Sequence, residues 1–553
     1  MFAGTLSEQN YQESMMPRLL KIFLCWMAIA GLPALAQAAD DGPQGRLVSA
    51  GWLAQRLGRP DLLVLDASPG ALHRKSHIPG AVNADLYAYS QAEVTPAQIE
   101  QRLRSWGIRP DQQLVIYDQG ATWIATRLFW DLLHRGVPAQ QLYILDGGMA
   151  KWSALGHALT QEATPAPPAG SISLGGPRQD VRVRLPEFLA ATGDPVHHVM
   201  LEALDPSYYF GGAAFFDRAG HVPHATLMPA GDFFNADKTF KSPPELERML
   251  RHLGVRPEQQ IHTYCGGGGA AAVPFFALKF ILNYPQVRLF QESQMGWLQD
   301  PRELPLWSYA DPHLLRDANW VKAWSSPMLK AFGLSKTSIV DVRSADQFKL
   351  GHVPQALNLP AAQLTEQLRS PEKLAALLGH AGLDPRHEVV LVSEGGLNEQ
   401  LALALLMLDG QGQQKVSLLL DGIERWAERG HEVARPGAKA APAPELAYAP
   451  KPRQGPLLTA LARSQGPRVF LASGPQPPAQ APDGPMLHLP YAQFLNADAS
   501  PKPAKEIWNL LEKAGLPRYT EIVLLGDQPG AAAVNYVILK LMGFRDVKVW
   551  LRG

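Results

Sequence analysis

The sequence is poor in cysteine and carries no excess of charge of either sign. Only Cys25 and Cys265 occur among 553 residues. Lysine plus arginine and aspartate plus glutamate both number 51, so the formal net charge at pH 7 is zero. A neutral chain has no overall field to attract nucleic acid or an anionic membrane, and we expect neither as a partner.

The first 38 residues have the pattern of a secretory signal peptide. Arg18 and Lys21 precede the apolar stretch Ile22–Leu32, and Ala36–Ala38 supplies a small-x-small cleavage pattern. We expect export to the periplasm and no membrane attachment after cleavage; an uncleaved anchor is the alternative. Cleavage would leave Cys265 as the only cysteine, which excludes an internal disulfide.

A chain of 553 residues is too long for one core. One pattern occurs four times: an apolar strand, a His-aliphatic-Pro step, a second strand, and a last strand. The four steps are His77-Ile78-Pro79, His221-Val222-Pro223, His352-Val353-Pro354 and His488-Leu489-Pro490. Strands that alternate with amphipathic stretches predict an α/β fold, in which a mainly parallel sheet is flanked by helices. We predict four such domains, at 45–160, 175–308, 315–434 and 450–553. The Pro/Ala-rich segments 162–170 and 435–454 are predicted linkers.

One segment carries the pattern of a reactive site. A predicted strand, Ile261–Tyr264, is followed by Cys265, then by Gly266, Gly267, Gly268, Gly269 and Ala270, and then by an alanine-rich helix. We expect backbone N–H groups and the helix N-terminus to converge on the sulfur, favouring the nucleophilic thiolate and holding the extra sulfur of a persulfide. This chemistry requires a sulfur open to solvent; the alternative is a buried, inert cysteine.

Two other kinds of glycine-rich loop are disfavoured, because this segment lacks the residues that they require. A phosphate-binding loop needs Lys and Ser/Thr after the glycines, where Ala270 and Ala271 stand. A cysteine phosphatase needs an arginine, and none lies between Cys265 and Arg288. The adjacent pair His197-His198 would point to opposite faces of a strand, so we predict no metal site and no cofactor.

Several motifs, in the right order, resemble the rhodanese and 3-mercaptopyruvate sulfurtransferase family. Residues 220–225 resemble its G-H-I-P-G-A, residues 263–268 its catalytic T-Y-C-G-S-G, and residues 290–297 its closing segment. Residues 45–306 look like a complete two-domain member, and the remainder looks like a degenerate second pair. The resemblance implies four tandem rhodanese-like domains, of which the second is catalytic.

The resemblance also implies a reaction. Cys265 would take sulfane sulfur from a small donor, thiosulfate or 3-mercaptopyruvate, and pass it to a thiophilic acceptor such as cyanide, a thiol or a protein. Arg218 matches the substrate-binding arginine of the family, or is a solvated surface residue. Asp66 and His77 match a proton relay; alternatively His77 fixes its turn by bonding backbone. The glycine cradle would bind the transferred sulfur.

The sequence departs from the family pattern near the cysteine. No cationic residue follows Cys265, Gly267 stands where mercaptopyruvate enzymes carry serine, and His224 replaces a glycine. In the other three copies Asp118, Glu394 and Gly526 or Asp527 are predicted at the cysteine position, and none forms a persulfide. These departures leave a second hypothesis open: a non-catalytic periplasmic sulfur-binding or scaffold protein.

Overall fold

The computed structural model describes residues 43–87, 95–435, 446–448, 455–462, 464, 466–478, 482–526 and 528–551. The predicted signal peptide lies outside the described residues. All described residues belong to one unit, which begins at Gly42. Within these ranges no helix is both long and apolar enough to cross a membrane.

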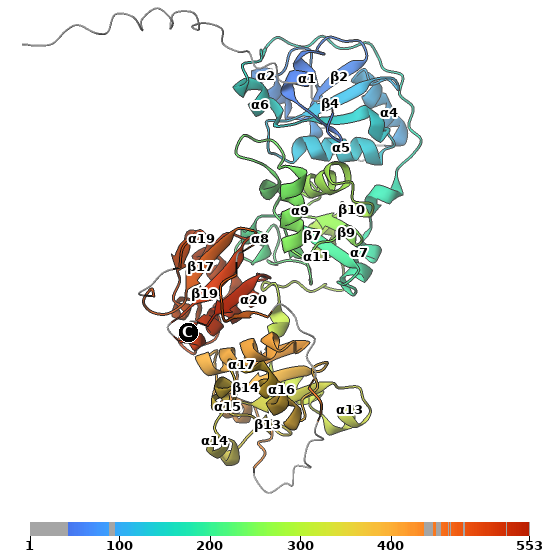
Figure 1. The fold of residues 1–553 in the computed structure, drawn as a ribbon. Helices are drawn as coiled ribbons and strands as arrows, with labels where there is room; N and C mark the ends of the chain where they lie inside the picture. The colour runs from blue at the N-terminus through green and yellow to red at the C-terminus, as the bar shows by residue number, and fades with distance from the viewer. Residues whose placement is uncertain are drawn as a thin grey trace, which may run out of the picture. The chain divides into compact units, whose positions relative to one another are not determined.

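Four five-stranded sheets follow one another along the chain (Figure 1). Counted along its own strands, each sheet has the order 1-5-4-2-3, and its paired strands are parallel. The predicted α/β class with parallel sheets is confirmed. The strands are β1 (Leu47–Val48), β2 (Leu62–Asp66), β3 (Val82–Asn83), β4 (Gln113–Tyr117) and β5 (Leu142–Leu145); β6 (Arg182–Val183), β7 (His198–Glu202), β8 (Thr226–Leu227), β9 (Gln260–Tyr264) and β10 (Val287–Phe290); β11 (Leu315–Arg316), β12 (Thr337–Asp341), β13 (Leu357–Asn358), β14 (Glu388–Val392) and β15 (Lys415–Leu419); β16 (Leu457–Leu458), β17 (Arg468–Ala472), β18 (Met486–His488), β19 (Glu521–Leu525) and β20 (Val547–Trp550).

Helices cross over between the parallel strands, as parallel pairing requires. Those of the first two domains are α1 (Ala50–Ala54), α2 (Gly70–Lys75), α4 (Pro96–Ser105), α5 (Ile124–His134), α6 (Gly148–Ala154), α7 (Leu185–Thr192), α8 (Pro206–Tyr209), α9 (Pro243–His252), α10 (Ala272–Phe276) and α11 (Ser293–Leu298). Those of the last two are α12 (Ala318–Trp324), α13 (Pro327–Ala331), α14 (Ala345–Leu350), α15 (Ala361–Glu366), α16 (Pro371–His380), α17 (Glu399–Gly410), α18 (Ile423–Glu428), α19 (Ala504–Lys513) and α20 (Pro529–Leu541).

The central strands are apolar throughout because both faces of each sheet are covered. In the first domain, β4 sends Leu114 and Ile116 into the core that contains α5. The alternate residues of the same strand, Val115 and Tyr117, pack with Trp152 of α6. Figure 1 accordingly shows α5 on one side of this sheet and α6 on the other.

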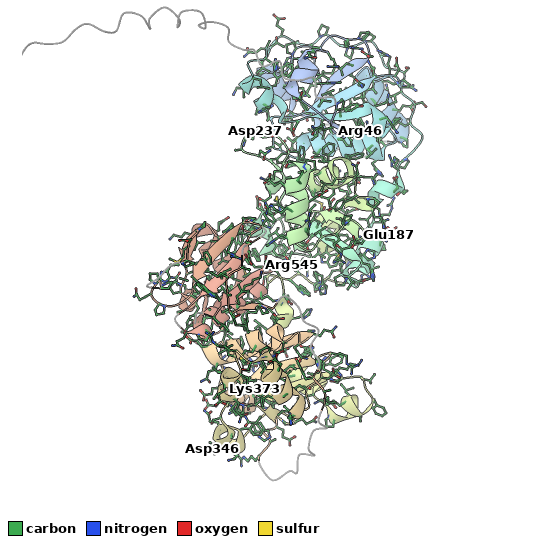
Figure 2. The ribbon with its side chains drawn as sticks, viewed as in Figure 1. Arg46, Glu187, Asp237, Asp346, Lys373 and Arg545 are labelled. Atoms are coloured by element: carbon green, nitrogen blue, oxygen red, sulfur yellow. The ribbon has the colours of Figure 1, made fainter. Side chains whose placement is uncertain are left out.

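Neighbouring domains share cores and hydrogen bonds. The rings of Phe129 on α5 and Phe276 on α10 meet edge to face, with centroids 5.0 Å apart. Lys151 Nζ of the first domain forms an ion pair with Asp237 of the second at 2.7 Å. Figure 2 labels Asp237 where the second domain meets the first. In the last two domains α17 and α20 pack together within one hydrophobic cluster. The domains are therefore joined through buried apolar contacts.

The predicted linker 162–170 is packed in part against the first domain. The N–H of Gly170 donates to the carbonyl oxygen of Arg104 at 2.7 Å. Arg104 Nε in turn donates to the carbonyl of Ile172 at 2.9 Å. A composition rich in proline and alanine indicates irregular backbone, and here that backbone is held by hydrogen bonds. Most of the second predicted linker, 435–454, lies outside the described residues.

Candidate active site at Cys265

Cys265 directly follows β9, the central strand of the second sheet. The side chains of β9 are buried from Ile261 to Tyr264. In an open parallel sheet, functional loops lie at the carboxyl ends of the strands, which is where Cys265 stands. The strand-then-glycine pattern therefore located the loop correctly.

The backbone of the loop donates a hydrogen bond to the sulfur. The N–H of Gly268 lies 3.1 Å from Cys265 Sγ. Gly268 has φ +82°, and a Cβ there would collide with the carbonyl oxygen of Gln291. The N–H of Cys265 donates to Ser293 Oγ at 3.1 Å, and that hydroxyl lies 4.0 Å from the sulfur. Glycine is thus required at 268 for both conformation and space.

The cradle differs from the sequence-based expectation. Among the described residues, Gly268 supplies the one backbone N–H that hydrogen-bonds the sulfur. Helix α10 begins at Ala272 and is only five residues long, followed by a π-helical turn, Ala277–Ile281. Tight turns precede it, in which the N–H of Ala272 donates to Gly269 O. These turns place the helix start at Ala272, and the short helix gives its N-terminus less of a role than we had expected.

The sulfur is covered, contrary to the expected access from solvent. Cys265 is 2% exposed. A Cβ on Gly266 would lie 2.8 Å from the ring of Phe215, and one on Gly269 would lie 2.8 Å from the ring of Trp123. Phe215 itself is 50% exposed. The cover over the loop is therefore aromatic, and its outer part lies at the surface.

Phe215 belongs to a segment that the first and third copies lack. In the first and third domains the His of the His-aliphatic-Pro step bonds, through Nδ1, the carbonyl oxygen four residues earlier. In the second domain His221 bonds Tyr209, twelve residues earlier. The additional residues between Tyr209 and His221 carry Phe215, whose ring stacks on Tyr208 at 4.4 Å. The repeat pattern contained this signal as an irregular spacing.

An arginine from the first domain supports the loop. Arg127 on α5 donates from Nη1 to the carbonyl oxygen of Gly268 at 2.7 Å. Its Nε lies 3.2 Å from Asp131 Oδ2, and both side chains are buried. Arg127 was not found from the sequence, because it lies on a helix of another domain, far from the motif.

A buried carboxyl group lies behind the loop. Glu202, at the end of β7, is fully buried and accepts a hydrogen bond from the hydroxyl of Tyr264, the residue before Cys265. Gln294 Nε2 lies 3.3 Å from its other oxygen, while the N–H of Gln294 donates to Cys265 O at 2.9 Å. Burial raises the pKa of Glu202 to about 8, so it is mostly protonated near neutral pH.

Comparisons with known proteins agree with this geometry. A probable 3-mercaptopyruvate sulfurtransferase of Pseudomonas aeruginosa is 35% identical over 278 residues, covering 46% of this chain and 96% of that protein. The chain belongs to the rhodanese family of sulfurtransferases. A model of the rhodanese-like domain matches residues 49–155 and 327–429, in the first and third domains.

Two further relatives cover similar lengths. The sulfur carrier protein TtuD of Thermus thermophilus is 27% identical over 274 residues, covering 45% of this chain and 93% of that protein. The crystal structure of SseA, a 3-mercaptopyruvate sulfotransferase of Escherichia coli, is 25% identical and aligns with a TM-score of 0.40, covering 45% of this chain and 98% of that one. Each of these comparisons spans about half of this tandem rhodanese chain.

Three residues matched to family roles have other partners. Arg218 is half-buried, and its Nη1 donates to Leu304 O at 3.0 Å; no hydrogen bond described here joins it to the loop. Asp66 and His77 are fully buried in the first rhodanese-like domain. Asp66 Oδ2 contacts His73 at 2.8 Å, and His77 Nδ1 bonds His73 O at 2.8 Å. His77 thus fixes its turn, which was the alternative interpretation, and none of its described hydrogen bonds reaches Cys265.

Strand register defines the cysteine position in the other rhodanese-like copies. In the second domain, the last residue of β7, Glu202, pairs with Tyr264, and Cys265 comes next in the chain. In each other domain we therefore take the residue that pairs with the last residue of β2, β12 or β17; the residue after it is equivalent to Cys265. These residues are Asp118, Ser393 and Gly526. The prediction of Glu394 in the third domain was wrong by one residue, because sequence spacing does not fix the strand end.

Asp118 is held by the loop of its own domain. Its Oδ1 accepts from Gly120 N at 2.8 Å and its Oδ2 from Ala125 N at 2.9 Å. The rhodanese loop thus satisfies a carboxylate with backbone N–H groups, as charge-assisted bonds favour. This satisfied carboxylate accounts for an acidic residue at that position without a catalytic role.

Proposed function

We propose that this chain is a periplasmic sulfurtransferase that carries sulfane sulfur as a persulfide on Cys265. The observation that carries the proposal is the hydrogen bond from Gly268 N–H to the Cys265 sulfur. A donor placed on sulfur stabilises negative charge there, and the thiolate is the nucleophile in sulfur transfer. The export signal expected in residues 1–38 supports the proposed location.

Sulfur loading proceeds by displacement on the donor. With thiosulfate, the Cys265 thiolate attacks the outer sulfur, the S–S bond of thiosulfate breaks, and sulfite leaves. With 3-mercaptopyruvate, the C–S bond breaks, the carbon leaves as the enolate of pyruvate, and this enolate takes up the proton that the donor thiol loses. Either donor leaves Cys265 as Cys–S–S⁻, whose terminal charge the Gly268 N–H is placed to share.

Unloading regenerates the enzyme. Cyanide or a thiolate attacks the terminal sulfur, the S–S bond of the persulfide breaks, and the electron pair returns to the Cys265 sulfur as thiolate. Cyanide leaves as thiocyanate, and a thiolate leaves as a persulfide. No external oxidant or reductant is needed. Thiosulfate already supplies sulfane sulfur, and with 3-mercaptopyruvate the two electrons lost by the thiol sulfur are taken up by the carbon that becomes the methyl group of pyruvate.

Access to the sulfur requires movement of its cover. Cys265 is 2% exposed, whereas Phe215 is 50% exposed and its ring lies against Gly266 of the loop. A side chain with an exposed outer face can rotate at low cost, since it gives up little packing. We infer that rotation of Phe215 away from Gly266 admits the donor and acceptor.

The same burial favours a second candidate function. A cysteine residue that is 2% exposed suits a protein that stores or delivers sulfur to a partner without rapid turnover. No cationic side chain of the described residues hydrogen-bonds the sulfur, so an anionic donor would meet backbone N–H and aromatic rings. Both functions require a persulfide on Cys265, and they differ in whether the sulfur is turned over rapidly.

One experiment separates them. Purified protein lacking residues 1–38 is incubated with thiosulfate or 3-mercaptopyruvate, and the product formed from cyanide or a thiol is measured with Cys265→Ser as the control. Cys265-dependent turnover supports the enzyme. A mass increase of one sulfur atom on Cys265 without turnover supports the carrier. Neither turnover nor adduct with either donor overturns both.

A further inference from the structure

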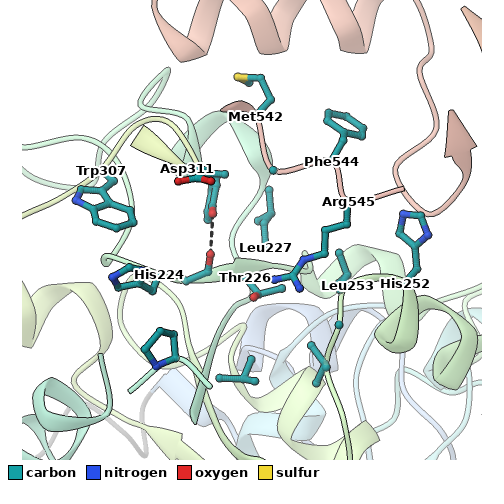
Figure 3. Close-up of a pocket in the computed structure, with 18 of the residues that line it drawn as sticks. His224, Thr226, Leu227, His252, Leu253, Trp307, Asp311, Met542, Phe544 and Arg545 are labelled. Carbon is teal, nitrogen blue, oxygen red and sulfur yellow. Dashed lines mark hydrogen bonds between the residues drawn. The ribbon is translucent and has the colours of Figure 1, made fainter. Parts of the chain in front are cut away.

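A large cavity lies where the second and fourth domains meet (Figure 3). Its volume is about 710 Å³, within the range of small-molecule sites. The second domain contributes residues at the amino ends of its strands, including His198 and Gln259, and the fourth domain contributes 542–545. Gln259 precedes β9 and Cys265 follows it, so the cavity and the sulfur lie at opposite ends of the same strand.

Arg545 carries a charge into this cavity without an ion-pair partner. No described carboxylate lies within 4.0 Å of its guanidinium, and no described hydrogen bond uses it. A Cβ on Gly254 would collide with Arg545 Nη1, so the guanidinium lies against the backbone of the second domain. Figure 3 shows the side chain extending from the fourth domain across to this wall. Packing against the second domain lowers the pKa of Arg545, because the charged form loses part of its hydration, while the residue as a whole remains exposed.

The other cations of the lining are already paired. Arg518 contacts Asp232 at 3.1 Å, Lys540 contacts Asp409 at 3.3 Å, and Arg256 contacts Glu258 at 2.7 Å. Asp311 is the one carboxylate among the residues of the lining. Among the cations of the described lining, Arg545 is therefore the one without an ion pair. This residue is exposed and its guanidinium is free of ion pairs, so it can bind an anion that enters the cavity.

The opposite wall is aromatic. His224 meets the ring of Trp307 edge to face at 4.5 Å, and His313 meets it at 4.9 Å. Burial lowers the pKa of both histidines, which keeps them neutral near pH 7. His224 has φ +63°, a left-handed conformation that histidine rarely adopts. This conformation places a neutral imidazole in the cavity where the family pattern would have glycine and no side chain.

We propose that this cavity binds a small organic anion, whose carboxylate, sulfonate or phosphate contacts Arg545 and whose planar apolar body packs against Trp307 and His224. A guanidinium binds such oxyanions with two parallel hydrogen bonds. The proposal gives the fourth domain, which has no cysteine, a role as the wall that supplies the arginine. It does not depend on the chemistry proposed for Cys265.

The test uses aromatic anions as probes on protein lacking residues 1–38. Calorimetric titrations are run with 2-naphthalenesulfonate, 2-naphthoate and 2-naphthyl phosphate, and with 2-naphthol as the neutral analogue. We expect saturable binding of one anion per chain, and affinity for 2-naphthol lower by about tenfold or more. The three anionic probes identify which oxyanion is preferred. The absence of saturable binding by all three overturns the proposal.

Variants assign the binding to Arg545. Arg545→Gln is expected to weaken binding of the preferred anion about tenfold or more and to leave 2-naphthol unchanged. Arg386→Gln removes an exposed arginine that is paired with Asp384 outside the cavity, and should leave binding unchanged. Arg545→Lys, which keeps the charge, serves if the glutamine variant does not fold, and should bind with intermediate affinity. Equal affinity in wild type and Arg545→Gln or Arg545→Lys contradicts the proposal. Cys265-dependent reactivity should be unchanged in every variant.

Discussion

Arg127 donates a hydrogen bond from Nη1 to the carbonyl oxygen of Gly268, 2.7 Å away. The N–H of the same glycine donates to the Cys265 sulfur at 3.1 Å. One peptide segment is therefore held from the first domain on one side while it contacts the sulfur on the other. The domain without a cysteine positions the loop of the domain that has one.

The first prediction concerns Arg127 as a positioning residue. Arg127→Lys removes the contact to Gly268 and keeps the charge, so we expect kcat for Cys265-dependent transfer to fall about tenfold with KM little changed. Asp131→Asn is the control, because asparagine still accepts from Arg127 Nε. Steady-state kinetics on both variants check this. An equal loss of activity in the two variants would show that Arg127 matters only for folding.

The second prediction separates two neighbouring glycines. Gly268→Ala forces a Cβ against the Gln291 carbonyl at φ +82°, and we expect at least about a tenfold loss of transfer activity and a lower melting temperature. A Cβ on Gly267 would meet only Met295 Cε, at 3.8 Å, so Gly267→Ala should keep the transfer activity and the melting temperature of the wild type. Activity and thermal unfolding are measured side by side. An active, stable Gly268→Ala protein would remove the reason for glycine at this position.

The third prediction tests the aromatic cover. Phe215→Ala uncovers Gly266, and we expect Cys265 to react with iodoacetamide several-fold faster, since the barrier of moving the ring is gone. The neighbouring Phe216, 41% exposed, provides the control Phe216→Ala, which should react as the wild type does. Mass spectrometry of the alkylated protein gives the rates. Unchanged reactivity in Phe215→Ala would mean that access follows another route.

The fourth prediction is a pH dependence of stability. The pKa of Glu202 is about 8 in the folded protein and near 4.5 when unfolded, so between these values the folded state holds the additional proton. The free energy of unfolding should therefore fall as pH rises from about 5 to 8, by about 1.4 kcal/mol per pH unit from this group. Its contribution is complete below pH 4.5 and lost above about pH 8.

Glu202→Gln should flatten this slope, because glutamine resembles the protonated acid. Glu245→Gln, on a half-exposed residue of α9 that pairs with Lys241, is the control and should keep the slope. Denaturant unfolding at several pH values measures both. A slope retained in Glu202→Gln would assign the proton to another group.

Much of the fold follows from local pattern. The four His-aliphatic-Pro steps and the alternation of apolar strands with amphipathic helices predicted four parallel sheets, because such strands must be covered on both faces. The strand-Cys-glycine pattern placed Cys265 at the carboxyl end of β9. Those features depend on residues near one another in the chain.

Tertiary packing decided what surrounds the sulfur. Arg127 and Trp123 reach the cysteine loop from the first domain, and no spacing in the sequence encodes those contacts. Phe215 lies in the additional residues before His221, which the spacing indicated without showing that they cover the loop. Likewise Arg545 meets Gly254 only because the fourth domain packs on the second. The sequence by itself determined the repeated fold and the place of Cys265 at the end of a strand. Burial of the sulfur, its supporting arginine and the cavity beside Arg545 exist only once the domains have docked, because long-range contacts are set by packing and not by local preference.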